Sequence, residues 1–134
     1  MLKKFIIFFF VPFFLIGCSN EQIVKVSNNA ADGEKREEIE NLIRDTKEVY
    51  TGTAILAGDE LLVAIQVNPW LGYKEQKVEK KLQKEIKEKY PDLHVLVSSD
   101  YKMHWESQKL LNEKDSKKLK DEVKKLKDLA KEET

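Results

Sequence analysis

The sequence predicts a small α+β domain, in which a three-stranded sheet is packed by helices and followed by a charged C-terminal helix. Two apolar runs flank a Gly-Asp-Glu turn within residues 53–67, which is the pattern of a β-hairpin. A lysine-rich helical pattern then separates the hairpin from a third apolar run at residues 93–99. Because such crossovers are right-handed, the second and third strands are expected to be parallel. The third strand would be antiparallel to the first if the two were neighbours.

A helix is predicted before the hairpin, over residues 35–50. Its apolar positions recur with helical spacing: Ile39, Leu42, Ile43, Thr46 and Val49. Asp32 is placed to cap its start, and Gly52 follows near the position of a helix stop.

The second strand of the hairpin is predicted to be central in the sheet. In residues 61–67 both alternating faces are largely apolar, which indicates a strand covered on both sides. The core is expected to contain Val63, Ile65, Val95 and Val97. Residues 68–73 open with Asn-Pro and are predicted to form a loop.

Three helices complete the predicted fold. The helix at residues 74–90 has a narrow apolar row of Val78, Leu82 and Ile86. The helix at residues 100–111 is capped by Ser99 or Asp100 and directs Met103, Ser107, Leu110 and Leu111 inward. The last segment carries a seam of Leu119, Val123, Leu126 and Ala130, which is short for an independent coiled coil. It is expected to dock on the domain or to fray.

The N-terminus predicts export with a lipid anchor. Lys3 and Lys4 precede an apolar run at residues 5–16 that contains Pro12. Twelve helical residues would rise only about 18 Å, less than the hydrocarbon core of a bilayer, so the run is typical of a signal peptide. It ends in Leu-Ile-Gly-Cys, the pattern of a bacterial lipobox, and Cys18 is the only cysteine. We expect Cys18 to carry diacylglycerol, and two acyl chains anchor a protein stably.

These patterns divide the chain into four predicted parts. They are a lipoprotein signal peptide at 1–17, a lipid-anchored tether at 18–34, an α+β domain at 35–112 and a charged helical tail at 113–134. Fully extended, the tether could reach about 50 Å. The segment Ile23–Val26 is open to a second interpretation, as a short strand. The element order would then be βαββαβ, as in ferredoxin-like folds.

Composition argues against several functions. Without residues 1–17 the chain has 22 basic and 24 acidic residues, and its only arginines are Arg36 and Arg44. This makes no electrostatic case for nucleic acid. The glycines are scattered singly, so no phosphate-binding loop or other cofactor site is indicated. His94 and His104 are too few for a zinc site and are interpreted as surface or edge residues.

Two surface sets are the candidate contact sites. The loop residues Trp70, Leu71 and Tyr73 could bind a partner or fold back over the sheet edge. Lys77, Lys81 and Lys84 could contact anionic lipid or polymer, although interleaved acids are also typical of a solvated helix face. The run Ser98-Ser99-Asp100 with His104 lacks the elbow motif of a hydrolase and is better explained by helix capping.

Several of these segments together resemble the YhcN/YlaJ type of sporulation lipoprotein of spore-forming Gram-positive bacteria. They are the lipobox cysteine, the polar segment after it, "AILAGDELLVAIQV", the lysine-rich helix and "LHVLVSSD", within roughly residues 18–111. The element order is also similar to that of BON modules, which implies binding to membrane or envelope components. The family resemblance implies a role in sporulation or germination and supplies no catalytic residues.

The expected function is therefore a non-enzymatic binding or assembly module at the cell or spore envelope. The chain would be exported and anchored on the outer face of the cytoplasmic membrane or on a spore membrane. Its partner would be an envelope or spore-membrane protein, and no small-molecule substrate is indicated. The alternatives are a small envelope hydrolase or metal-dependent enzyme, and a general envelope lipoprotein unrelated to sporulation.

Overall fold

The computed structural model describes residues 23–27 and 33–132. The predicted signal peptide at 1–17, the lipidation site Cys18 and the helix cap at Asp32 lie outside these residues.

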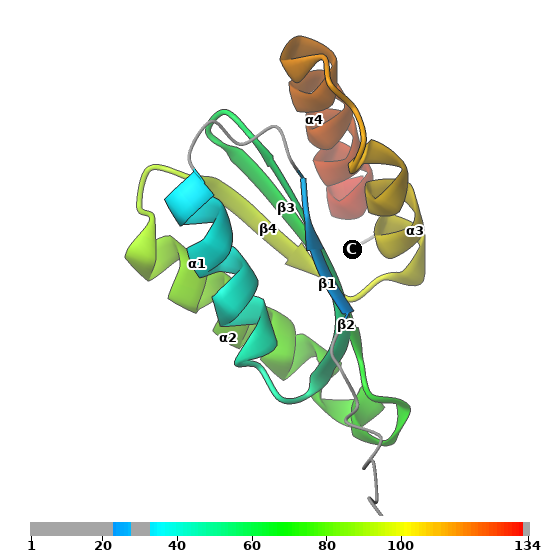
Figure 1. Ribbon diagram of the computed structural model, residues 1–134. Coiled ribbons are helices and arrows are strands. Elements are labelled where there is room, and N and C mark those ends of the chain that lie inside the picture. Colours follow the sequence, from blue (N-terminus) through cyan, green and yellow to red (C-terminus); the bar gives the residue numbers. More distant parts are fainter. Residues whose placement is uncertain (1–22, 28–32, 133–134) are drawn as a thin grey trace, which may run out of the picture.

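A four-stranded mixed sheet forms the centre of the molecule (Figure 1). Its strands are β1 (Ile23–Val26), β2 (Val49–Ala57), β3 (Glu60–Val67) and β4 (His94–Ser98), and they lie side by side in chain order. The β1 and β2 strands are parallel, β2 and β3 are antiparallel, and β3 and β4 are parallel. The α+β class is confirmed, but the prediction of three strands is wrong, because Ile23–Val26 adds a fourth.

The predicted hairpin and crossover are both present. Gly58 makes the hairpin turn with a φ of 62°, a backbone conformation that favours glycine. Helix α2 (Glu75–Lys89) carries the chain from β3 to the parallel β4. The βαββαβ order of the second interpretation is therefore observed, but each pair of parallel strands is directly hydrogen-bonded. The sheet thus differs from the ferredoxin-like arrangement, and β4 pairs with β3 rather than with β2.

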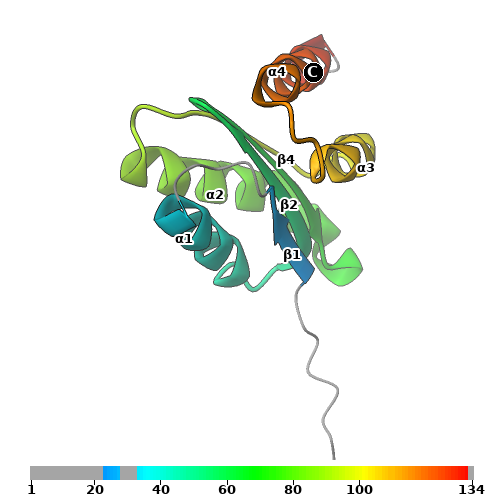
Figure 2. The ribbon, with the colours of Figure 1, turned by 45° about the horizontal axis from the view of Figure 1, so that its top comes forward.

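Helices cover both faces of the sheet, so the molecule has three layers (Figure 2). Helix α1 (Gly33–Arg44) and α2 pack on one face, while α3 (Tyr101–Leu110) and α4 (Ser116–Glu132) pack on the other. Each face has its own apolar cluster, which explains why both faces of β2 and β3 are apolar. The four residues expected in the core, Val63, Ile65, Val95 and Val97, are all buried in the cluster under α1 and α2.

The helices differ in detail from the predictions. Helix α1 ends at Arg44, earlier than predicted, because Val49 already pairs with Val67 in the sheet. Asp100 caps α3 by accepting a 3.0 Å hydrogen bond from the backbone N–H of Lys102. The α4 seam docks on the sheet, where Leu119, Val123 and Leu126 are buried.

Gly52 allows α1 to approach the sheet closely. It lies within β2 and is not the helix stop that the sequence suggested. A Cβ atom at this position would lie 2.8 Å from Cγ2 of Ile43, whose side chain is fully buried. The absence of a side chain at Gly52 is therefore what lets Ile43 fit against β2.

Replacing Gly52 with alanine is expected to lower the free energy of unfolding by about 1–3 kcal/mol, because the buried contact would be overpacked. Gly72→Ala is the matched control, since nothing lies within 4 Å of its added Cβ. Urea unfolding followed by circular dichroism measures both variants. Equal midpoints for the two variants would show that close approach at Gly52 is not needed.

Candidate binding surfaces

One end of the sheet brings together the start of β1, the start of β2 and the end of β3. Ile23 pairs with Thr51, which pairs with Gln66, and Val49 pairs with Val67. The chain then enters a short 3₁₀ helix, η1 (Pro69–Lys74). We call this the anchor end, because β1 is the described segment closest in the chain to Cys18 (Figure 1).

The predicted contact loop is located at the anchor end as η1. Trp70 and Tyr73 are 81% and 80% exposed, so their rings do not fold back over the sheet edge. Leu71 behaves differently, because it is partly buried against the core under α1 and α2. The structure therefore separates the three predicted residues into two exposed aromatic rings and one apolar residue that attaches η1 to the domain.

The predicted lysine set lies on the solvent-facing side of α2. Lys77, Lys81 and Lys84 are all exposed, and the apolar row of Val78, Leu82 and Ile86 on the same helix is buried. Lys84 lies 3.9 Å from Glu88, an exposed pair that contributes little to stability. Lys77 is closest in the chain to η1, one turn after the exposed Tyr73.

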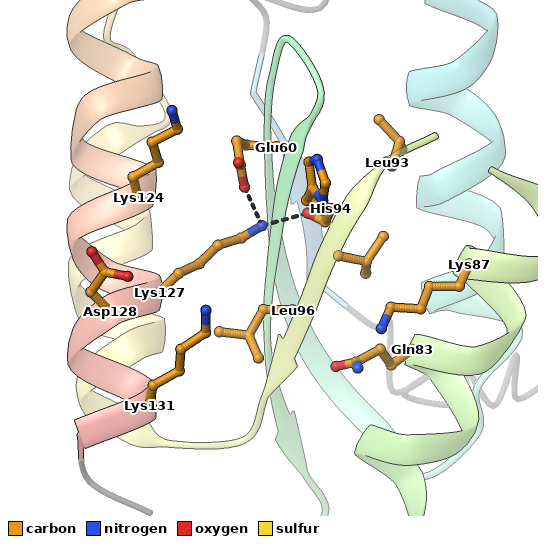
Figure 3. A pocket seen from close by; sticks show the side chains of 11 residues that line it. Glu60, Gln83, Lys87, Leu93, His94, Leu96, Lys124, Lys127, Asp128 and Lys131 are labelled. Atoms are coloured by element: carbon orange, nitrogen blue, oxygen red, sulfur yellow. Dashed lines mark hydrogen bonds and ion pairs between the residues drawn. The ribbon is translucent and has the colours of Figure 1, made fainter. Parts of the chain in front are cut away.

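A second surface was not predicted from the sequence. A groove of about 580 Å³ runs along the edge of β4, between α2 and α4 (Figure 3). Four lysines and two carboxylates line it, together with Gln83 of α2, His94, Leu93 and apolar residues of β4. The lysines are Lys87, Lys124, Lys127 and Lys131, and the carboxylates are Glu60 and Asp128. Because these residues come from four separate elements, no sequence motif identifies the groove.

Lys127 ties the two sides of the groove together. Although charged, it is only 8% exposed. Its Nζ lies 2.6 Å from Oε2 of Glu60 and also donates a hydrogen bond to the backbone carbonyl of His94 (Figure 3). This buried pair neutralises Glu60, so the remaining charge of the groove is mainly that of lysines. The groove therefore suits an anionic group better than a cation.

The hairpin turn makes a further charged contact with α4 beside the groove. Asp59 lies 3.0 Å from Nζ of Lys120 and 3.7 Å from Nε2 of His94. The hydrogen bond from Lys120 lowers the pKa of the Asp59 carboxyl below its usual value. These side chains are exposed, so the contact connects α4 to the hairpin turn in solvent rather than building a catalytic site.

The two histidines have different environments. His94 is exposed, as expected. The surface interpretation of His104 is wrong, because this residue of α3 faces the sheet and is only 6% exposed. Burial lowers the pKa of His104, and a smaller opposing effect comes from the backbone of Ala64. Its Nε2 lies 3.1 Å from the side-chain amide of Gln108. The residue is thus a core histidine favoured in its neutral form.

The serine–aspartate run before α3 has structural partners. Asp100 caps the helix, and the hydroxyl of Ser99 donates a hydrogen bond to Oε1 of Glu79 in α2. The Oγ of Ser98 accepts a hydrogen bond from the backbone N–H of Asp100. Within residues 23–27 and 33–132, no three potential metal-binding side chains are grouped, and no helix is long and apolar enough to cross a membrane.

These features define a small α+β domain with exposed candidate binding surfaces, and the comparisons identify its family. Residues 19–125 match the model of the sporulation lipoprotein YhcN/YlaJ family. The chain therefore belongs to this family, which is not a known enzyme family. Membership of a lipoprotein family implies export and a membrane lipid anchor. No curated protein and no solved structure matches the chain.

Proposed function

We propose that this protein is a lipid-anchored, non-enzymatic binding or assembly module that acts at the envelope during sporulation or germination. The observation that carries the proposal is the family match, which starts at Ser19, directly after the lipobox cysteine. Diacylglycerol on Cys18 would hold the domain on the outer face of the cytoplasmic membrane or on a spore membrane. An envelope or spore-membrane protein is the expected partner.

The fourth strand changes the expected reach of the domain. Ile23 is five residues after Cys18, so the first described residue of the sheet can lie at most about 18 Å from the anchor. This is well below the 50 Å allowed by a tether that ends at residue 34. Confinement near the membrane raises the effective concentration of a membrane-bound partner, so weak contacts can suffice.

The groove along β4 is the surface that we assign to the partner. Glu60 and His94 lie at the hairpin end of the sheet, opposite the end where β1 begins. Lys124 and Lys127 of α4 lie beside Glu60 and His94, whereas Lys131 lies beside Leu96, further along β4 (Figure 3). A domain held by Cys18 would thus present the Lys124 end of the groove away from the membrane, where an acidic segment of a partner could enter.

The anchor is tested by replacing Cys18 with alanine. We expect the variant to leave the membrane fraction and to incorporate no labelled palmitate, because the chain would then have no thiol to alkylate. Intact mass should show that the native protein lacks residues 1–17 and carries the lipid. Ser19→Ala, which keeps the thiol, is the control. Recovery of Cys18→Ala in the membrane at the normal level would exclude the anchor.

The biological role is tested in a deletion strain. We expect expression in the developing spore and a modest germination or outgrowth defect that the wild-type chain rescues and Cys18→Ala does not. Equal rescue by the unanchored variant would remove tethering from the mechanism. Expression confined to vegetative growth would instead support a general envelope lipoprotein.

A further inference from the structure

We propose that the anchor end docks on the bilayer that carries the lipid, with the rings of Trp70 and Tyr73 in the membrane interface. This inference rests on the proposed lipidation of Cys18. It goes further, because a lipid tether alone leaves the domain free to rotate, whereas docking gives it one orientation.

The first evidence is the position of the exposed apolar side chains. Among the described residues, Trp70 and Tyr73 are the most exposed large hydrophobic side chains, at 81% and 80%. Ile23 and Tyr50, also exposed, lie at the same end of the sheet. The other exposed large hydrophobic residues, Tyr101, Trp105 and Leu129, lie on α3 and α4. Scattered exposed apolar residues are ordinary, but four of them at one end of the sheet indicate a contact surface.

The second evidence is the short distance to the anchor. Ile23 lies at this end of the sheet, and at most about 18 Å of chain separates it from Cys18. With the lipid inserted, the end that contains η1 must therefore remain close to the headgroups. A partner protein at this surface would have to fit into that narrow space, whereas the bilayer is already present there.

The third evidence is the chemistry of the side chains. Tryptophan and tyrosine favour the membrane–water interface, because their rings are apolar and their N–H or O–H groups remain hydrated. Lys74 comes directly after Tyr73, and Lys77 lies one helical turn further along the chain. The Nζ of Lys74 lies 5.7 Å from the centre of the Tyr73 ring. A lysine close to an anionic membrane surface is attracted to the lipid headgroups. The anchor end thus combines interfacial rings with cations for lipid phosphates.

The backbone supports this role of η1. Leu71 packs partly against the core, and its backbone N–H donates a 2.8 Å hydrogen bond to the carbonyl of Asn68. The short helix then continues directly into α2. The two rings are therefore held outward by a segment that is attached on both sides, so little ordering is needed when they enter the interface.

The two tryptophans of the chain allow a direct test. Residues 18–134 would be coupled through Cys18, the only thiol, to a maleimide lipid in vesicles of phosphatidylcholine and phosphatidylglycerol. Trp105→Phe leaves Trp70 as the only tryptophan, and Trp70→Phe leaves Trp105, which is on α3, so that excitation at wavelengths absorbed by tryptophan but not by tyrosine reports on one residue at a time. Lipids brominated near the headgroup end of their acyl chains quench tryptophans located in the interface.

We expect Trp70 emission to shift to shorter wavelength and to be quenched several-fold more strongly than Trp105 emission. Equal quenching of both, or none of Trp70, would overturn the docking. Circular dichroism of both variants verifies the fold. Because the lipid is attached chemically, the result does not depend on lipidation in cells. A negative docking result would not affect the proposed lipidation of Cys18. A negative Cys18→Ala result would not affect this measurement, because the lipid is attached chemically.

Discussion

A fragment of residues 35–112 is expected to be largely unfolded at room temperature, whereas residues 19–134 should unfold in one cooperative transition. The sequence alone predicts 35–112 as the domain, and the folding of this fragment tests that boundary. The structure gives a reason to expect the longer unit, because the fragment lacks β1 at one edge of the sheet and α4 on one face. Each removed element contributes buried apolar side chains.

The loss of α4 should be the larger of the two effects. Leu119, Val123 and Leu126 are buried against Ile55 and Leu62 of the sheet. Burial of an aliphatic side chain contributes about 1.5–3 kcal/mol, so these three contribute about 5–9 kcal/mol. The whole stability of a domain is typically about 5–15 kcal/mol, and a chain without α4 should therefore be close to unfolded.

The loss of β1 exposes the edge of β2. Val24 and Val26 are buried on the α1 side of the sheet. Ser27 reinforces the pairing, because its N–H donates to the carbonyl of Ala54 and its Oγ accepts from the N–H of Leu56. Without β1, these β2 groups lose their partners, and an unpaired strand edge also favours aggregation.

Urea unfolding followed by circular dichroism separates the contributions. The two single truncations are 19–112, which lacks α4, and 35–134, which lacks β1 and the first two residues of α1. A chain that starts at residue 23 is the matched control and should keep the full midpoint, because it retains all four strands and all four helices. A cooperative transition of fragment 35–112 with the same midpoint would show that the shorter domain is sufficient.

Local patterns were sufficient to predict much of this fold. The hairpin follows from Gly58 between two apolar runs, and α2 follows from the spacing of Val78, Leu82 and Ile86. Strand β1 cannot be assigned from local pattern alone, because it has only four residues, which alternate between buried and exposed. Such a short strand forms only when β2, which follows α1 in the chain, provides its hydrogen-bonding partners. The sequence pattern indicates a helix stop near Gly52 for a similar reason. The actual role of Gly52 depends on Ile43, a residue that only tertiary packing brings close to it.

The candidate surfaces likewise divide into one that local sequence indicates and one that only tertiary packing creates. The exposed rings of Trp70 and Tyr73 could be suspected from a Pro-Trp-Leu-Gly-Tyr segment, because such a loop is local. The groove of β4 could not, since Glu60, Gln83 and Lys127 are brought together only by the sheet and its two helical layers. The burial of His104 likewise depends on how α3 lies on the sheet.

Replacing Lys127 with methionine is expected to lower the free energy of unfolding by roughly 3 kcal/mol, the cost of breaking a buried ion pair by removing one partner. Methionine keeps most of the apolar stem, so the loss would come from the charge. Glu60, whose side chain is only 12% exposed, would lose its 2.6 Å partner, and the carbonyl of His94 would lose a donor. Urea unfolding measures the change.

Lys124→Met is the matched control, because Lys124 is exposed, belongs to the same helix and lines the same groove. It should change the free energy of unfolding by less than about 0.5 kcal/mol, as is usual for surface substitutions. The double variant Lys127→Met with Glu60→Met should recover a large part of the loss, because no carboxylate would then be buried without a partner.

These variants also separate structure from binding at the groove. Lys127 is expected to hold α4 against the hairpin, and Lys124 to remain available for an acidic partner, since it forms no ion pair with another described residue. Lys124→Met should therefore weaken partner binding while the fold keeps its stability, and Lys127→Met should reduce stability first. A Lys127→Met variant as stable as the wild type would mean that the ion pair with Glu60 is not needed to hold α4, which would then be held by its buried Leu119, Val123 and Leu126.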